Sequence, residues 1–137
     1  CLLVQHDNIA GIGFGLDLTK RKTQSKLKAA GLPWERSKAF TGSALFSEFV
    51  QAPEDLSQLG LELRINDALR QKGDVSLMLY PLAVILEELR QFLTLEDGDI
   101  IMTGTPAGVG PVQSGECFDG RVLAGEQVLA QAVWQAH

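Results

Sequence analysis

Apolar residues occupy every second position from 61 to 65, and charged residues stand between them. This two-residue period is typical of a β-strand that buries one face. The pair Asn66-Asp67 follows and predicts a tight turn into a second strand over residues 68–71. The segment is therefore expected to form a β-hairpin.

A helical period takes over between residues 81 and 93. Apolar side chains recur there at spacings of three and four, which is typical of a helix that packs one face against a core. Pro81 suits the first helical position, because its missing N–H would have no intrahelical partner there. The apolar positions are Leu82, Ile85, Leu86, Leu89, Phe92 and Leu93.

The continuous apolar run at 77–80, just before this helix, allows two interpretations. It is either a buried strand, which we favour, or part of a subunit interface. Only the second interpretation requires another chain.

The remaining elements are short. Strands are expected at 2–4 and 9–18, and Thr19 is a candidate N-cap for a surface helix that ends near Gly31. A strand at 99–102 and a hairpin formed by 122–123 and 127–134 complete the pattern. The chain is therefore predicted to have a mixed α/β, strand-rich fold with a few short helices, as a single domain over residues 1–137.

Composition narrows the class of protein. No apolar run reaches the length of a membrane span, so no membrane partner is expected. The two cysteines, Cys1 and Cys117, cannot make a disulfide framework, and a reducing cytoplasm is the expected location. A net charge of −5 argues against nucleic acid as the main partner.

The charge is unevenly distributed along the chain. Seven of the twelve basic residues lie between Lys20 and Lys38, together with one acid, Glu35. Such a run is commonly a solvated helix face. It could also include a basic wall beside a site for an anionic, carboxylate-bearing substrate, with Arg21 and Lys38 facing inward.

Residues 103–110, with the sequence TGTPAGVG, follow the apolar strand at 99–102. Three glycines allow the backbone amides of this loop to approach a ligand closely, because glycine has no Cβ. The loop is not a phosphate-binding P-loop, since no Gly-Lys-Ser/Thr follows. A purely structural turn at a sheet edge is the alternative.

Three separated motifs resemble the signature of the fumarylacetoacetate hydrolase family. The segments 15–24 (GLDLTKRKTQ) and 31–40 (GLPWERSKAF) match the family patterns G-x-D-x-T-x-R-x-x-Q and G-x-P-W-x-x-[AS]-K-x-F. The loop at 103–110 matches T-G-T-P-x-G-V-G. The resemblance covers nearly the whole chain and implies a β-roll-like fold.

The resemblance also implies roles for single residues. Asp17 would be a ligand of a divalent metal, Mg²⁺ or Mn²⁺, and carboxylate oxygens suit both ions. On spacing alone, Asp17 could instead cap a helix or pair with a cation. Lys38 would be the active-site lysine that stabilises enolate charge. The substrate-binding residues would be Arg21, Gln24, Gly104 and Thr105.

Two further motifs of the family are absent from the printed sequence. It contains no Glu-x-Glu pair, which supplies the other metal ligands in relatives, and His6 does not belong to a His-x-x-Glu dyad. The interval before Asp17 also looks short, so we expect these residues to come from a longer protein with N-terminal and loop segments missing. A truncated, inactive homologue is the alternative.

The function implied by the resemblance is that of a metal-dependent hydrolase. It would cleave a C–C bond in a small anionic 1,3-dicarbonyl or 2-oxo acid substrate, such as an acylpyruvate or fumarylpyruvate, through a metal-stabilised enolate. The alternatives are oxaloacetate decarboxylation or keto–enol isomerisation at the same site, or a non-catalytic dimerising homologue. A homodimer is expected in every case.

Overall fold

A computed structural model describes all residues from Cys1 to His137. The chain divides into two compact units, one formed by residues 1–14 and 47–137 and the other by residues 15–46. The expectation of a single domain stays a prediction.

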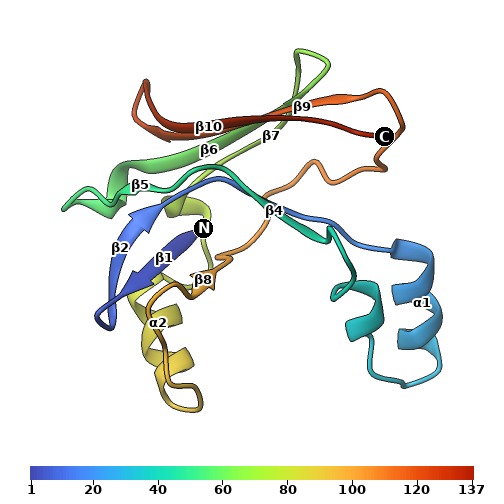
Figure 1. The fold of residues 1–137 in the computed structure, drawn as a ribbon, viewed down its shortest axis with the longest axis horizontal. Helices are drawn as coiled ribbons and strands as arrows, with labels where there is room; N and C mark the ends of the chain where they lie inside the picture. The colour runs from blue at the N-terminus through green and yellow to red at the C-terminus, as the bar shows by residue number, and fades with distance from the viewer. The chain divides into compact units, whose positions relative to one another are not determined.

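The larger unit contains two antiparallel four-stranded sheets (Figure 1). The first has the order β5 (Val50–Gln51), β2 (Asn8–Ile12), β1 (Leu2–Gln5) and β8 (Ile100–Ile101). The second has the order β10 (Gln127–Gln135), β9 (Cys117–Ala124), β6 (Leu59–Ile65) and β7 (Ala68–Asp74). Helix α2 (Leu82–Arg90) and two 3₁₀ turns, η2 (Leu56–Gln58) and η3 (Val75–Leu77), complete it.

The predicted β6–β7 hairpin is confirmed. Asn66 and Asp67 both have positive φ, 50° and 64°, as a two-residue turn matched to strand twist requires. His6 and Asp7 make a second turn of this kind, with φ of 50° and 57°, between β1 and β2. Arg90 of α2 donates to the Asp7 carboxylate at 3.1 Å and so fastens the helix to this turn.

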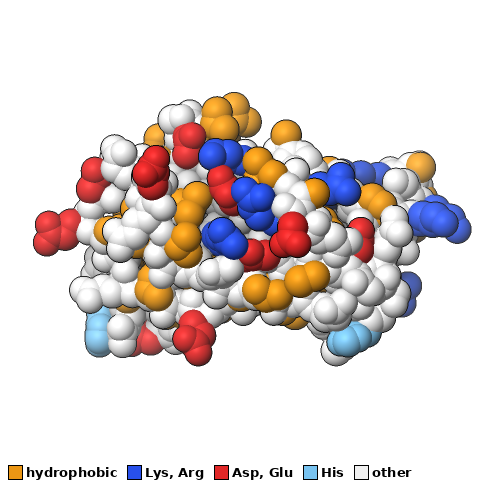
Figure 2. Space-filling model, turned by 90° about the horizontal axis from the view of Figure 1, so that it is seen from above, with side chains coloured by type: hydrophobic (Ala, Val, Ile, Leu, Met, Phe, Trp, Pro, Cys, Tyr) orange, Lys and Arg blue, Asp and Glu red, His pale blue; other side chains and the backbone are white.

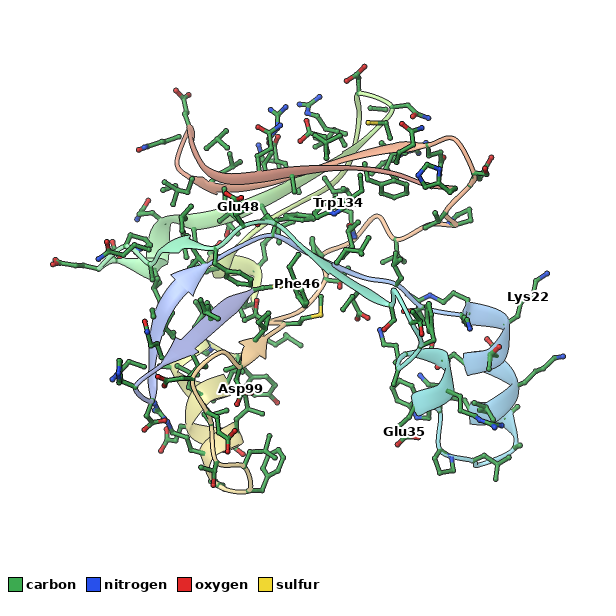
Figure 3. The ribbon with its side chains drawn as sticks, viewed as in Figure 1. Lys22, Glu35, Phe46, Glu48, Asp99 and Trp134 are labelled. Carbon is green, nitrogen blue, oxygen red and sulfur yellow. The ribbon has the colours of Figure 1, made fainter.

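The core of the larger unit holds apolar side chains from both sheets. Phe14 is buried, and its ring centroid lies 6.2 Å from that of Trp134 on β10, which is labelled in Figure 3. A Cβ at Gly120 would lie 2.3 Å from the Phe14 ring, so only glycine fits beneath it. The other buried apolar residues of this unit are Leu2, Val4, Ile12, Leu59, Leu63, Leu86, Ile101, Phe118, Val122 and Ala130.

Charged side chains form ion pairs on the second sheet, one between neighbouring strands and one within β9. Figure 2 shows basic and acidic side chains side by side in the middle of its view. Lys72 donates to Glu62 at 2.9 Å, and Asp119 accepts from Arg121 at 2.6 Å and from Gln131 at 2.8 Å. These hydrogen bonds, first of all those from Lys72 and Arg121, hold the pKa of the Glu62 and Asp119 carboxyls below their ordinary values.

The smaller unit consists of a strand pair, an α-helix and a 3₁₀ turn. β3 (Gly15–Asp17) pairs with β4 (Ala44–Phe46), and α1 (Arg21–Ala29) and the 3₁₀ turn η1 (Glu35–Ser37) lie between them in sequence. Gly31 has a φ of 64° just after α1, as a residue that ends a helix in the left-handed conformation does. The predicted surface helix and its ending are therefore confirmed.

Four predicted details are wrong. The strand at 9–18 breaks after Ile12, because the Phe14 N–H and C=O both bond to Ser47, each at 2.9 Å. Thr19 does not cap α1; its hydroxyl contacts Lys38 instead, and Lys20 stands at the N-cap. The helix predicted at 81–93 covers only Leu82–Arg90, with Pro81 at the N-cap.

The fourth detail is the run at 77–80. It forms the end of η3 and a bend rather than a buried strand. Leu79 is 93% exposed, and Leu77 and Tyr80 are also exposed. None of the chain's helices is long and apolar enough to cross a membrane.

Candidate active site

Strand β3 brings Asp17 to the surface of the smaller unit. Leu16, which pairs with Leu45, is buried, and Asp17, which pairs with Ala44, faces the opposite way. The Asp17 side chain keeps 37% of its accessible surface. The strand's alternation thus presents a carboxylate at a partly sheltered position.

Lys38 meets this carboxylate. Its ammonium group forms an ion pair with the Asp17 carboxylate and donates to the Thr19 hydroxyl at 3.0 Å. The side chain of Lys38 is 34% exposed, so the pair is half sheltered from water. Lys38 is therefore held in place by two partners instead of moving freely in solvent.

Two hydrogen bonds of Ser37 hold the backbone just before Lys38. Ser37 is fully buried, and its hydroxyl donates to the Trp34 carbonyl. Its own carbonyl accepts from the Lys20 N–H at 3.0 Å, which ties η1 to the start of α1. Neither bond uses Lys38, whose side chain remains free to reach Asp17.

The first turn of α1 contributes Arg21 and Gln24. The Arg21 guanidinium donates to the Gln24 side-chain oxygen at 3.2 Å, so the two share one helix face as their spacing predicts. Gln24 is 8% exposed and is the buried residue of this helix. The smaller unit therefore holds four of the six predicted site residues.

The other basic residues of this unit have different surroundings. The Lys20 ammonium lies 4.3 Å from the Phe40 ring centroid, and that of Lys28 lies 4.5 Å from the Trp34 centroid, distances typical of cation–π contacts. Lys22 points away from α1 into solvent (Figure 3). The basic run therefore combines one lysine held by a carboxylate with lysines that contact rings or water.

Gly104 and Thr105 lie in the larger unit, in the loop at 103–110. Both are exposed, and Gly104 has a φ of 129° with no atom within 4 Å of the place where a Cβ would stand. The backbone on this side of the loop is open to an incoming group. The loop contacts β7, where the side-chain amide of Gln71 donates to the Pro106 carbonyl at 3.2 Å.

The sequence pattern missed Thr19 as a partner of Lys38 and Gln71 as a support of the loop. Thr19 stands inside a motif, so its fixed spacing from Asp17 was an available signal. Gln71 lies in a polar strand segment and gave no such signal.

The residues present do not by themselves form a complete site for a metal ion. No three His, Cys, Asp or Glu side chains in the chain lie close enough together to hold one. Asp17 offers one carboxylate, and its near partner is Lys38. Binding Mg²⁺ or Mn²⁺ here requires further ligands.

Comparison with known proteins gives a consistent result. The profile of the family described as fumarylacetoacetate (FAA) hydrolase C-terminal matches residues 5–132. The oxaloacetate tautomerase YcgM of Escherichia coli K12 is 43% identical over 122 residues, which are 84% of this chain and 56% of that protein. The human mitochondrial oxaloacetate tautomerase FAHD1 is 42% identical over 112 residues, which are 80% of this chain and 51% of that protein.

Solved structures share the fold. The crystal structure of a putative fumarylacetoacetate isomerase/hydrolase from Oleispira antarctica superposes with a TM-score of 0.87 at 41% identity. The match covers 96% of this chain and 60% of that one. A fumarylpyruvate hydrolase from Pseudomonas aeruginosa, solved in complex with Mn²⁺ and pyruvate, has a TM-score of 0.82 at 30% identity, over 93% and 54%.

The chain spans about half the length of the curated relatives that it matches. Within that half, the matched profile, the identity and the fold agree with the three sequence motifs. The chain belongs to the fumarylacetoacetate hydrolase family.

Proposed function

We propose that this chain forms part of an enzyme that interconverts the keto and enol forms of a small 2-oxo acid of the oxaloacetate type. The observation that carries the proposal is the ammonium of Lys38, held between the Asp17 carboxylate and the Thr19 hydroxyl. The curated relatives named above are oxaloacetate tautomerases, which favours this reaction over the family's other chemistries.

Tautomerisation moves one proton between a carbon and the oxygen of the neighbouring carbonyl. Negative charge builds up on that oxygen while the carbon–hydrogen bond breaks. An ammonium that is already in position stabilises such charge as the transition state forms, because it needs no reorientation at that moment. In this proposal Lys38 has that role, and Asp17 and Thr19 hold it at the required place.

The substrate's carboxylates need partners of their own. The planar guanidinium of Arg21 can make two parallel hydrogen bonds to a carboxylate, and Gln24 already holds its orientation at 3.2 Å. We propose Gly104, through its amide, and Thr105, through its hydroxyl, as further substrate-binding residues. Their exposure leaves both groups available to the substrate.

Hydrolysis of an acylpyruvate or fumarylpyruvate is the second candidate. It is supported by the structural match to the Pseudomonas aeruginosa fumarylpyruvate hydrolase, at 30% identity. Both reactions pass through an enolate beside the same lysine, and hydrolysis additionally needs an activated water.

One assay separates the candidates. The purified chain is given oxaloacetate and an acylpyruvate in parallel, with Mg²⁺ or Mn²⁺ present, and enol absorbance and released pyruvate are followed. We expect faster loss of the oxaloacetate enol signal without carbon dioxide or pyruvate release. Pyruvate released from the acylpyruvate alone would favour the hydrolase, and no acceleration of any reaction would contradict both.

Asp17 is also our proposed metal ligand. In a protein that supplies the further ligands, we expect Asp17→Ala to abolish Mn²⁺ binding measured by calorimetry while the circular dichroism spectrum stays unchanged, because the side chain is partly exposed. Asp97→Ala is the control, since Asp97 is exposed and lies outside the motifs. Equal Mn²⁺ affinity of wild type and Asp17→Ala would overturn the assignment.

A homodimer also remains a proposal. Large apolar side chains at 77–80 and after α2 stay exposed, with Leu79 at 93% and Phe92 at 73%. Exposed apolar groups of this kind are available to a second chain.

A further inference from the structure

Few hydrogen bonds hold the loop at 103–110 in place. It contains no helix or strand, and no backbone–backbone hydrogen bond joins its residues to the rest of the chain. The one hydrogen bond made to it comes from the side-chain amide of Gln71, which donates to the Pro106 carbonyl at 3.2 Å. The position of the loop therefore depends on this side chain and on packing.

Gln71 is an unusual residue for its place. Its side chain is 8% exposed, although β7 is mostly exposed along its length. Burying an amide is costly unless it is hydrogen-bonded, and Gln71 meets this condition through the loop. The strand thus buries a polar group where it meets the loop.

The packing of the loop on β7 is equally specific. A Cβ at Gly108 would lie 1.9 Å from the Arg70 carbonyl oxygen, so the loop backbone lies directly against the strand backbone. A Cβ at Gly73 would lie 3.0 Å from the Pro106 Cβ, so the strand leaves room for the proline ring. Gln71 stands between these two close approaches.

We propose that Gln71 is a positioning residue for substrate binding. It fixes the loop through the Pro106 carbonyl, so that the adjacent Gly104 amide and Thr105 hydroxyl meet the carboxylate of a 2-oxo acid. This inference rests on the proposed function for the role of the loop, and on the contacts of β7 for the role of Gln71. Gln71 itself does not touch the substrate.

The first test replaces the amide with a group of similar size that cannot donate. In Gln71→Met we expect cleavage within residues 103–110 by a non-specific protease to become at least tenfold faster, while cleavage within β6 and β9 is unchanged. With oxaloacetate, KM should rise about 3- to 10-fold, the range that corresponds to one hydrogen bond, and kcat should stay within about twofold. Gln127→Met, at an exposed position in β10, is the control.

The second test gives a signature that a purely structural role would not produce. In Gln71→Glu the ionised carboxylate cannot donate, and we expect the same defect near pH 8. A buried carboxyl has a raised pKa, so lowering the pH towards about 5 protonates it and restores a donor. KM and the rate of loop cleavage, each relative to wild type at the same pH, should then recover in Gln71→Glu but not in Gln71→Met.

The outcomes distinguish this inference from the proposed function. Unchanged cleavage at 103–110 in Gln71→Met would overturn the positioning role whatever the activity. Faster cleavage throughout the chain, without recovery of Gln71→Glu at acid pH, would also overturn it, because Gln71 would then support the fold rather than the loop. The wild type could show no activity while the loop alone loosens in Gln71→Met. That result would refute the proposed function and leave the role of Gln71 in the loop intact.

Discussion

Lys38→Ala is expected to lower kcat with a 2-oxo acid by about 10²–10³-fold, the usual scale for losing one group that stabilises developing charge. The reason is the geometry of its ammonium, which two partners hold and which is the group that we place beside the enolate oxygen. Steady-state kinetics measure the change. KM should move much less than kcat, because the charge exists mainly in the transition state.

Lys22→Ala supplies the matched control, because Lys22 carries the same charge in the same unit but points into solvent. The Asp17–Lys38 pair is partly exposed, so its loss should cost the fold less than about 1 kcal/mol. An equal kcat for Lys38→Ala and Lys22→Ala would remove Lys38 from the mechanism. A loss of folded protein, seen by circular dichroism, would show a structural role instead.

Local patterns predicted the local structure well. The alternation at 61–65 and the pair Asn66-Asp67 led to the β6–β7 hairpin, because both the strand period and the turn conformation are properties of neighbouring residues. The spacing of apolar residues in the same way predicted α2. The last turn of the predicted helix does not form, because Phe92 and Leu93 are exposed and have no core to hold them in a helix.

Patterns failed where a distant residue decides the structure. Thr19 has the chemistry of an N-cap, yet its hydroxyl contacts Lys38, 19 positions away in the sequence. The run at 77–80 is apolar enough for a buried strand, but no neighbouring strand pairs with it. Composition predicts that a segment can be buried, and only the tertiary partners decide whether it is.

In the candidate site, too, contacts between distant residues could not be predicted from local patterns. The contact of Asp17 with Lys38 agrees with the family motifs, but no periodicity in the sequence indicates a pairing across 21 positions. Gln71 could not be found at all, because a glutamine in a polar strand is ordinarily exposed. Its burial follows from the loop that lies against it, which the sequence of β7 does not contain.

Gly108→Ala is expected to displace the loop at 103–110 and to raise KM for a 2-oxo acid at least tenfold. Gly108 has a φ of 102°, which side chains rarely adopt, and the added Cβ would lie 1.9 Å from the Arg70 carbonyl oxygen. That oxygen belongs to the backbone of β7, which cannot move without disturbing the sheet. The loop must therefore shift, at a cost of about 1–3 kcal/mol from backbone strain alone.

Gly110→Ala is the matched control in the same loop. Gly110 has no atom within 4 Å of the place where a Cβ would stand and no positive φ, so alanine should change stability by less than about 0.5 kcal/mol. Thermal unfolding and steady-state kinetics of both variants make the comparison. If Gly108→Ala behaved like Gly110→Ala, the close approach of loop and strand would not exist in solution, and the role assigned to Gln71 would lose its structural basis.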